Sequence, residues 1–281
     1  MSSRWRIRWR RLNLGLATLF GHPRGFFIPY RYAATIPATR PAYPALERLF
    51  GAETSTFAQR LTALAGHAAD FAAIGTAAPP APRWNQSWFP RLDAAIAYAM
   101  VRSGRPRRIV EIGSGHSTRF LARAVLDGGL ATEIVALDPA PRAVLTGLPI
   151  HFIPQPLTGA GLAPFAALEA GDILFIDSSH ILMPGTDVDI LFNRILPELA
   201  PGVIVHIHDI LLPDDYPADW AWRGYNEQQG VAALLQGGAY TPLFSSHYAV
   251  TRMAAEVAAS AVATLPLNAE ARETSLWLLK R

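Results

Sequence analysis

The chain has 281 residues, of which 51% are hydrophobic and 17% are charged, and it contains no Cys. The absence of Cys excludes disulfide frameworks, thiolate metal clusters and cysteine nucleophiles. The length is sufficient for one large domain, or for a medium domain with an extension, and for an ample hydrophobic core.

The formal net charge of +3 is unevenly distributed along the chain. Residues 1–46 contain eight Arg and no acidic residue, so this segment carries +8 and the remainder carries −5. A nucleic-acid-binding protein would place its basic surface on the folded domain rather than in an arm. We therefore expect no nucleic-acid partner.

No segment has the composition of a membrane span. The two longest stretches without acidic or basic side chains are residues 143–168, which contain four Pro, and residues 228–251, which are rich in Gly, Gln and Ser. Neither stretch fits the roughly 20 apolar helical residues that a bilayer requires. The apolar run at residues 12–20 is short and lacks a small-residue cleavage site, so a secretory signal is not indicated. We expect a soluble cytoplasmic protein with no transmembrane span.

The basic arm has the pattern of an amphipathic helix. Its apolar residues recur at helical spacing, and its Arg residues fill much of the opposite side: Trp5, Trp9, Leu12, Leu16 and Leu19 against Arg4, Arg8 and Arg11. Such a helix suits a membrane-surface anchor or an Arg-rich transit peptide. We favour the third alternative, a helix that docks on its own chain or on a second copy in a homo-oligomer.

Helical patterning resumes at residues 45–50 and 54–74, and the Ala- and Pro-rich residues 76–82 resemble a linker. We therefore place a domain boundary near residue 82. Residues 1–82 would form a basic arm and helical extension, and residues 83–281 the main domain.

Beyond residue 82, strand and helix patterns alternate, which predicts a doubly wound, mostly parallel seven-stranded α/β sheet. Strands are expected at residues 108–112, 133–137, 150–154, 173–176, 203–207, 240–245 and 275–279. Helices are expected at residues 90–102, 118–126, 187–199, 226–236 and 252–264.

Residues 109–118 combine an apolar strand, a Gly-rich turn and a helix that begins with hydroxyl residues. A helix N-terminus after such a turn favours an anionic group. A dinucleotide fingerprint would need a third Gly where Thr118 stands, and a phosphate loop would need a Lys. Instead Glu111 precedes Gly113 and Gly115 in the pattern E-x-G-x-G, and Asp138 ends the second strand, where its carboxylate can accept bonds from both hydroxyls of a ribose.

These features resemble the class I S-adenosylmethionine-dependent methyltransferases, which have a Rossmann-like fold. The resemblance covers residues from about 84 to 281 and rests on residues 110–115, 137–139, 175–177 and 201–202. It implies that Gly113 and Gly115 lie against the methionine part of S-adenosylmethionine, that Glu111 organises the same region and that Asp138 holds the ribose. Ser114 and Pro139 complete the expected cofactor-binding residues.

Polar residues also follow the next two strands of the expected sheet. Asp177 ends the fourth strand, and His208 and Asp209 follow the fifth. Because the carboxyl ends of parallel strands meet at one edge, these side chains should converge. Two carboxylates and an imidazole suit a divalent cation, for which Mg²⁺ or Mn²⁺ is expected.

A bound cation would help a hydroxyl to lose its proton and would orient it toward a sulfonium methyl group. The arrangement resembles metal-dependent O-methyltransferases of the catechol type, in which an Asp after strand four and an Asp-Asn pair after strand five bind Mg²⁺. His180 stands where those enzymes carry a Lys that takes the substrate proton, so the resemblance implies that His180 and Asp177 are catalytic. His206, two residues before His208, is expected to be a core histidine.

The sequence thus predicts metal-assisted O-methylation of a small hydroxylated metabolite by S-adenosylmethionine. One alternative is a metal hydrolase that uses His206, His208 and Asp209. Another is a binding module that retains the cofactor without turnover.

Overall fold

The computed structural model describes residues 3–21, 25, 28–37, 39–75, 77–158 and 161–281. Within these ranges, contacts divide the chain into two compact units: residues 41–215 with 225–281, and residues 1–40 with 216–224. Thr76 of the predicted linker lies outside the described residues. No helix in the described ranges combines the length and the apolar composition needed to cross a bilayer.

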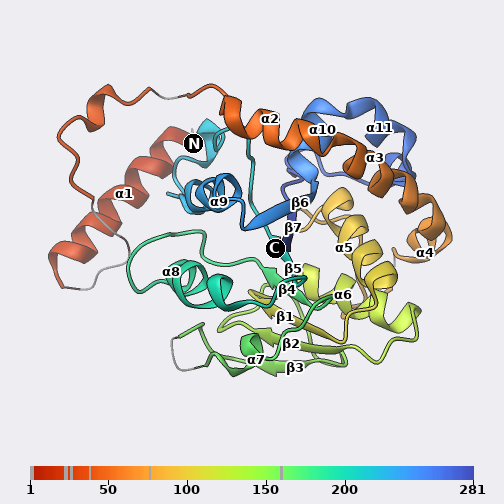
Figure 1. Ribbon diagram of the computed structural model, residues 1–281. Coiled ribbons are helices and arrows are strands. Elements are labelled where there is room, and N and C mark those ends of the chain that lie inside the picture. The colour runs from red at the N-terminus through yellow and green to blue at the C-terminus, as the bar shows by residue number, and fades with distance from the viewer. Residues whose placement is uncertain (1–2, 22–24, 26–27, 38, 76, 159–160) are drawn as a thin grey trace. The chain divides into compact units, whose positions relative to one another are not determined.

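The larger unit contains one seven-stranded sheet in the order β3-β2-β1-β4-β5-β7-β6 (Figure 1). The first five strands pair in parallel, whereas β7 is antiparallel to both of its neighbours. The predicted doubly wound, mostly parallel sheet is therefore confirmed. The strand bounds are β1 Arg108–Ile112, β2 Glu133–Leu137, β3 His151–Ile153, β4 Ile173–Ile176, β5 Ile204–Ile207, β6 Tyr240–Ser245 and β7 Leu276–Lys280.

Helices cover both faces of this sheet. On one face lie α5 (Arg91–Gly104) and α6 (His116–Asp127), and on the other lie α8 (Asp187–Ile190) and α9 (Glu227–Gln236) (Figure 1). The short helix α7 (Ala163–Ala166) precedes β4, and α10 (Ser246–Arg252) and α11 (Ala254–Ala259) follow β6. Apolar side chains of both layers meet the buried strands β1 and β4, as a parallel sheet with two covered faces requires.

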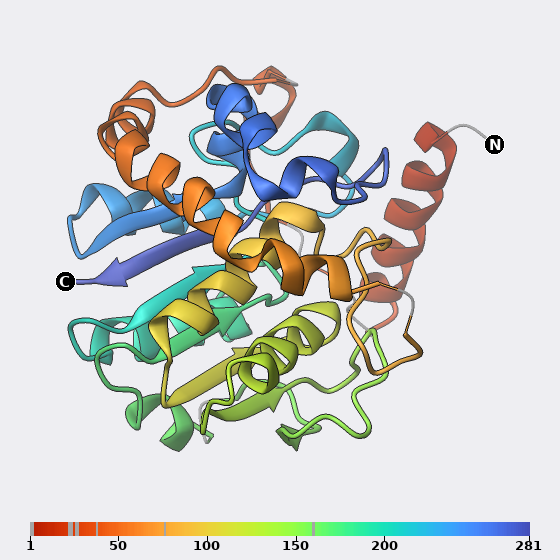
Figure 2. The ribbon, with the colours of Figure 1, turned by 90° about the vertical axis from the view of Figure 1, so that its right-hand side faces the viewer.

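Helices α2 (Pro44–Ala52), α3 (Thr54–Ala63) and α4 (Ala68–Ala73) belong to the core of the same unit. Figure 2 shows these orange helices running across the face that carries α5 and α6. Phe57 of α3 is fully buried, with its ring centre 5.6 Å from that of Phe244 in β6, and Phe50 of α2 stacks on Tyr248 at 5.7 Å. The expected boundary near residue 82, as the place where the cofactor-binding domain begins, stays a prediction.

Two expected helices are interrupted. The segment 187–199 is helical only as far as Ile190, continues as a π-helical turn at Leu191–Ile195 and closes as a 3₁₀ turn at Leu196–Glu198. Pro197 has no N–H for a regular helical bond, which explains the break. Similarly, a 3₁₀ turn at Leu64–His67 separates α3 from α4.

The expected Ala-rich helix over residues 252–264 is wrong as a single element. Instead α10 begins at Ser246, capped by the Ser245 hydroxyl, and α11 ends before the extended residue Ser260. Val257 and Val262 are both buried although they are five residues apart, a spacing that places them on different faces of one continuous helix. A break between them allows both side chains to enter the core.

The smaller unit contains α1 (Ser3–Leu19) and two 3₁₀ turns, Ala33–Thr35 and Ala218–Trp220. The helix predicted for the basic arm is therefore present. Within this unit the rings of Trp5 and Trp9 meet edge to face with centres 5.9 Å apart, and the Arg10 guanidinium lies 4.5 Å from the ring centre of Trp222.

The register of the sheet places the ends of four strands side by side. The last residues of β1, β2, β4 and β5 are in register: Ile112, Leu137, Ile176 and Ile207. The hydrogen-bond ladder continues one residue further, because each following residue donates its N–H to the end of the neighbouring strand. The backbone of the residues predicted to form the site is thereby fixed at one edge: Gly113, Asp138, Asp177 and His208.

Candidate active site

The turn after β1 packs directly against the end of β4. Gly113 has a positive φ of 74°, which L-residues with side chains rarely adopt. A Cβ atom at this position would lie 1.9 Å from the carbonyl oxygen of Asp177, so no residue with a side chain fits here. Gly115 is different, because its nearest neighbour would be the backbone nitrogen of Ala143 at 3.9 Å.

Asp138 ties the turn after β2 to the turn after β1. One carboxylate oxygen accepts hydrogen bonds from the backbone N–H of Ser114 at 2.6 Å and from its hydroxyl at 3.2 Å. The other oxygen accepts a bond from the N–H of Ala140 at 2.7 Å, next to the exposed Pro139. Asp138 therefore shapes the Gly-rich turn in addition to any role toward a ribose, and that role stays a prediction.

Glu111 is fully buried beneath this turn. The Ser117 hydroxyl donates to its Oε1 at 2.6 Å, but its Oε2 has no hydrogen-bond partner among the described residues. Burial raises the pKa of Glu111 to about 8, against the hydrogen bonds from Ser117 and Thr118. A buried carboxylate oxygen without a partner fits a site that receives a cationic group from outside the chain.

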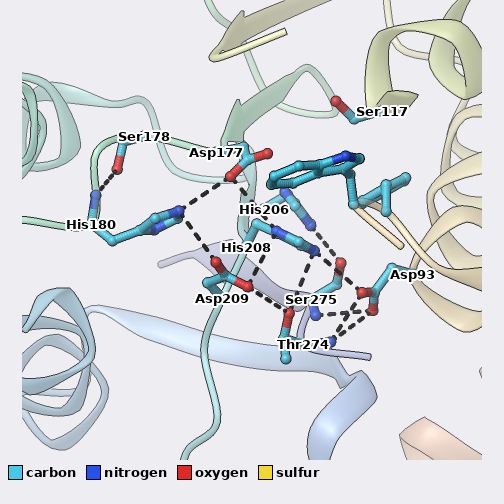
Figure 3. Close-up of polar contacts among 12 residues, drawn as sticks. Asp93, Ser117, Asp177, Ser178, His180, His206, His208, Asp209, Thr274 and Ser275 are labelled. Carbon is cyan, nitrogen blue, oxygen red and sulfur yellow. Dashed lines mark hydrogen bonds and ion pairs between the residues drawn. The ribbon is translucent and has the colours of Figure 1, made fainter. Parts of the chain in front are cut away.

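Four side chains from the ends of β4 and β5 point toward one another (Figure 3). His180 Nε2 lies 3.3 Å from Asp177 Oδ1 and 3.6 Å from Asp209 Oδ2. His208 Nδ1 lies 3.6 Å from the same Asp177 oxygen and 3.7 Å from Asp209 Oδ1. The structure thus brings together Asp177, His180, His208 and Asp209, which we call the acid–imidazole cluster.

Two buried carboxylates support this cluster from behind, and neither was identified as a site residue from the sequence. Glu227, at the start of α9, lies 2.8 Å from His180 Nδ1. Asp93 of α5 lies 3.3 Å from His208 Nε2 and accepts hydrogen bonds from the backbone N–H groups of Thr274 and Ser275. Each imidazole therefore turns one nitrogen toward a supporting acid and the other toward Asp177 and Asp209.

The buried charges in the cluster reinforce one another. Burial would raise the pKa of Asp177, but His208 and His180 outweigh it and hold that pKa well below its usual value. Burial would lower the pKa of His180, but the hydrogen bonds to Asp177 and Glu227 and the charge of Asp209 raise it well above the usual range. For His208, the charges of Asp177 and Asp209 likewise outweigh burial and raise the pKa. The surrounding carboxylates therefore favour the protonated form of both imidazoles.

The acids outnumber the imidazoles in this region. Asp93, Asp177, Asp209 and Glu227 surround only two imidazoles. Asp93 and Glu227 are fully buried and Asp209 is 12% exposed, whereas the Asp177 side chain is 32% exposed. Burial raises the pKa of Glu227, but a surplus of negative charge remains even when Glu227 is protonated. The cluster therefore attracts a further cation.

By donor type, Asp177, His208 and Asp209 fit a divalent cation. A histidine that binds a metal usually donates its other ring N–H to a carboxylate, and His208 is held in that way by Asp93. Across the ranges that the structure describes, however, no three His, Asp or Glu side chains are arranged as ligands of one ion. The acids here bond the two imidazoles instead.

Two members of the cluster have a left-handed backbone. His180 has a φ of 61° and Asp209 a φ of 55°, and Arg105 is the third such non-Gly residue in the described part of the chain. Such conformations cost about 1–3 kcal/mol and persist where the surrounding structure enforces them. They accompany the positions of the His180 imidazole beside Asp177 and of the Asp209 carboxylate beside both imidazoles.

His206 lies outside the cluster, as expected for a core histidine. It is fully buried, and its ring stacks on Phe175 with the ring centres 3.7 Å apart. Its Nε2 lies 2.8 Å from the Ser275 hydroxyl, and burial lowers the pKa of His206 well below its usual value. A hydrolase site that uses His206 as a metal ligand therefore has no support in this geometry.

The substitution Glu227→Gln tests the support of His180. The amide oxygen still accepts a bond from Nδ1, so the ring should keep its place, but the loss of the carboxylate should lower the pKa of His180. NMR titration of the imidazole measures this change. Glu133→Gln, which removes the same charge from an exposed position, is the matched control. An unchanged His180 pKa in Glu227→Gln would contradict the assignment.

Comparisons with known proteins find one family match and several similar solved structures. Residues 110–210 match a family model described as a methyltransferase domain. No curated protein matches the chain. Similar solved structures include the SAH-bound methyltransferase PaMTH1 from Podospora anserina, at 15% identity and a TM-score of 0.40, covering 92% of this chain and 99% of that one.

Two further structures with similarity are the O-methyltransferase from Bacillus cereus in complex with SAH and the O-methyltransferase TomG from Streptomyces achromogenes in complex with SAM. The first is 14% identical with a TM-score of 0.39, and the match covers 79% of this chain and 91% of that chain. The second is 16% identical with a TM-score of 0.38, and the match covers 78% and 89%. The family match, the sheet order and the Gly-rich turn are together consistent with a class I S-adenosylmethionine-dependent methyltransferase domain that includes residues 110–210.

Proposed function

We propose that the enzyme transfers the methyl group of S-adenosylmethionine to a hydroxyl group of a small hydroxylated metabolite, and that the acid–imidazole cluster is the place of transfer. The observation that carries this proposal is the contact between Gly113 and the carbonyl group of Asp177. It joins the Gly-rich turn, where the cofactor is expected, to the residue at the centre of the cluster.

The residues expected to hold the cofactor line the first two turns of the sheet edge: Glu111, Gly113, Ser114, Gly115, Asp138 and Pro139. The partnerless Oε2 of Glu111 supports this assignment. When bound, S-adenosylmethionine supplies an electrophilic methyl group on a sulfonium cation. The negative charge that the supporting acids Asp93 and Glu227 add around the acid–imidazole cluster complements that cation.

The chain's own residues would orient the acceptor and take its proton. His180 serves as a base only in its neutral form, whereas its contacts with Asp177 and Asp209 favour the protonated form. The neutral form is favoured once those carboxylates bond another cation. Asp177, His208 and Asp209 would hold Mg²⁺ or Mn²⁺, which lowers the pKa of a coordinated hydroxyl. The metal-assisted reaction is thus a proposal supported by donor type and by the position of Asp93.

Calorimetry and turnover test the proposal together. S-adenosylmethionine should bind to the wild-type protein, and Mn²⁺ binding should be lost in the double variant Asp177→Asn/Asp209→Asn. Release of S-adenosylhomocysteine with a panel of hydroxylated small molecules should fall about 10²- to 10⁴-fold in His180→Ala. Absence of cofactor binding would reject the whole proposal. Unaltered turnover after removal of divalent ions would reject only the role of the metal. Full turnover in His180→Ala would reject only the assignment of His180 as the base.

A matched pair of Gly substitutions separates folding from cofactor binding. Gly113→Ala should destabilise the fold by about 2–5 kcal/mol, because the left-handed backbone and the Asp177 carbonyl both oppose a Cβ atom. Gly115→Ala should cost about 1 kcal/mol or less, since no atom lies within 3.9 Å. It should nevertheless weaken S-adenosylmethionine binding, because the proposal places the methionine part of the cofactor against Gly115. Denaturant unfolding and calorimetry measure the two effects, and wild-type affinity in Gly115→Ala would argue against this placement.

Cofactor binding should release a proton from Glu111. The raised pKa of about 8 leaves this side chain mostly protonated at pH 7. A cationic group of the cofactor beside it would favour the ionised form and lower its pKa, so close to one proton should leave on binding. Calorimetry in two buffers of different ionisation enthalpy measures the release. It should vanish at about pH 9.5 or above, where Glu111 is already ionised in the free protein. It should also vanish in Glu111→Gln. Equal proton release in Glu111→Gln would place its source elsewhere.

A further inference from the structure

We propose that α1 binds an anionic membrane surface, with its axis in the plane of the bilayer. This inference concerns the smaller unit and does not depend on the proposed methyl acceptor. It begins with an apolar stripe at spacings of four and three residues along one side of the helix: Trp5, Trp9, Leu12, Leu16 and Leu19.

The stripe is exposed along its length. The exposed fractions of its side chains range from 42% at Leu16 to 77% at Leu19, and Phe20, which follows the helix, is 74% exposed. Single exposed apolar residues are ordinary, but five in one helical row mark a binding surface. Trp5 and Trp9 stand at one end of the row, and Trp is the side chain that best occupies the boundary between lipid and water.

The charge of α1 identifies the chemistry of the partner. The helix contains five Arg and no acid, and no acidic residue occurs before Glu47. Within the described residues, no carboxylate forms an ion pair with Arg8, Arg10 or Arg11, and the Arg10 guanidinium instead lies over the ring of Trp222. A helix with Arg on its polar side and Trp and Leu on its apolar side suits the headgroup region of an anionic bilayer.

The same charge argues against the other occupants of this face. A second copy would bring an identical basic helix against the first, without counter-charge in either arm. A nucleic acid would pair with the Arg residues but would leave the Leu residues in water. An anionic lipid surface would contact both sides of the helix favourably. The headgroups would pair with the Arg side chains, and the apolar stripe would be buried at the edge of the acyl chains.

Co-sedimentation of the full chain with vesicles tests the inference. The protein should bind phosphatidylcholine vesicles that contain about 30 mol% phosphatidylglycerol and not pure phosphatidylcholine, and high salt should weaken the binding. Leu12→Gln/Leu16→Gln and Arg8→Glu/Arg11→Glu should each reduce vesicle binding by about tenfold or more. Leu126→Gln is the matched control, because this α6 side chain is also exposed, at 71%, but lies outside α1.

Thermal unfolding of every variant is the control for folding, and the larger unit should unfold as in the wild type. Binding that is equal for both vesicle types, or that survives both double substitutions, would overturn the inference. So would a wild-type dimer that ignores vesicles and dissociates in Leu12→Gln/Leu16→Gln, because that result would assign the stripe to a contact between subunits.

Discussion

Close contact between the turn after β1 and the carbonyl group of Asp177 constrains the backbone of the candidate site at this edge of the sheet. The N–H of Asp177 bonds to the carbonyl of Ile112 at 2.8 Å, so the two strands are locked in register up to the site. The carbonyl of Asp177 then fills the space above Gly113. Because neither backbone can shift without the other, the Gly-rich turn and the acid–imidazole cluster keep a fixed relation.

The cluster combines buried charges that would be unfavourable singly. A lone ionised group in this environment would lose its hydration without compensation. Here every charge has a neighbour of opposite sign: Glu227 and Asp93 each hold one imidazole, and Asp177 contacts both imidazoles. The buried charges reduce the stability of the fold but fix the orientation of the side chains. The left-handed backbones of His180 and Asp209 are a second unfavourable feature that this arrangement maintains.

Much of this architecture was predictable because its signals are local. The apolar runs of β1, β2, β4 and β6 define their bounds, and the parallel order brings Asp138, Asp177 and His208 to one edge. The supporting acids were not predictable in the same way. Asp93 lies in a helix whose apolar pattern does not indicate a polar partner for it. Glu227 lies in the first turn of a helix, where acidic residues are common for other reasons.

The errors in helix prediction have a similar origin. The pattern of an Ala-rich segment is compatible with a helix of any length. The break at Ser260 depends instead on tertiary packing, which buries both Val257 and Val262. The placement of His180 was predictable from its distance to Asp177 along the chain, but its protonation was not. That depends on Glu227, 47 residues away, and on Asp209.

The contacts that hold Asp93 have a consequence for the order in which the protein folds during synthesis. Its carboxylate is fixed by backbone groups of Thr274 and Ser275, more than 180 residues later in the chain, where β7 enters between β5 and β6. On a ribosome, β1 to β5 are complete long before that segment emerges. A nascent chain would therefore form the Gly-rich turn before the backbone groups that hold Asp93, and through it His208, are available. The candidate site would be completed only when the last strand has joined the sheet.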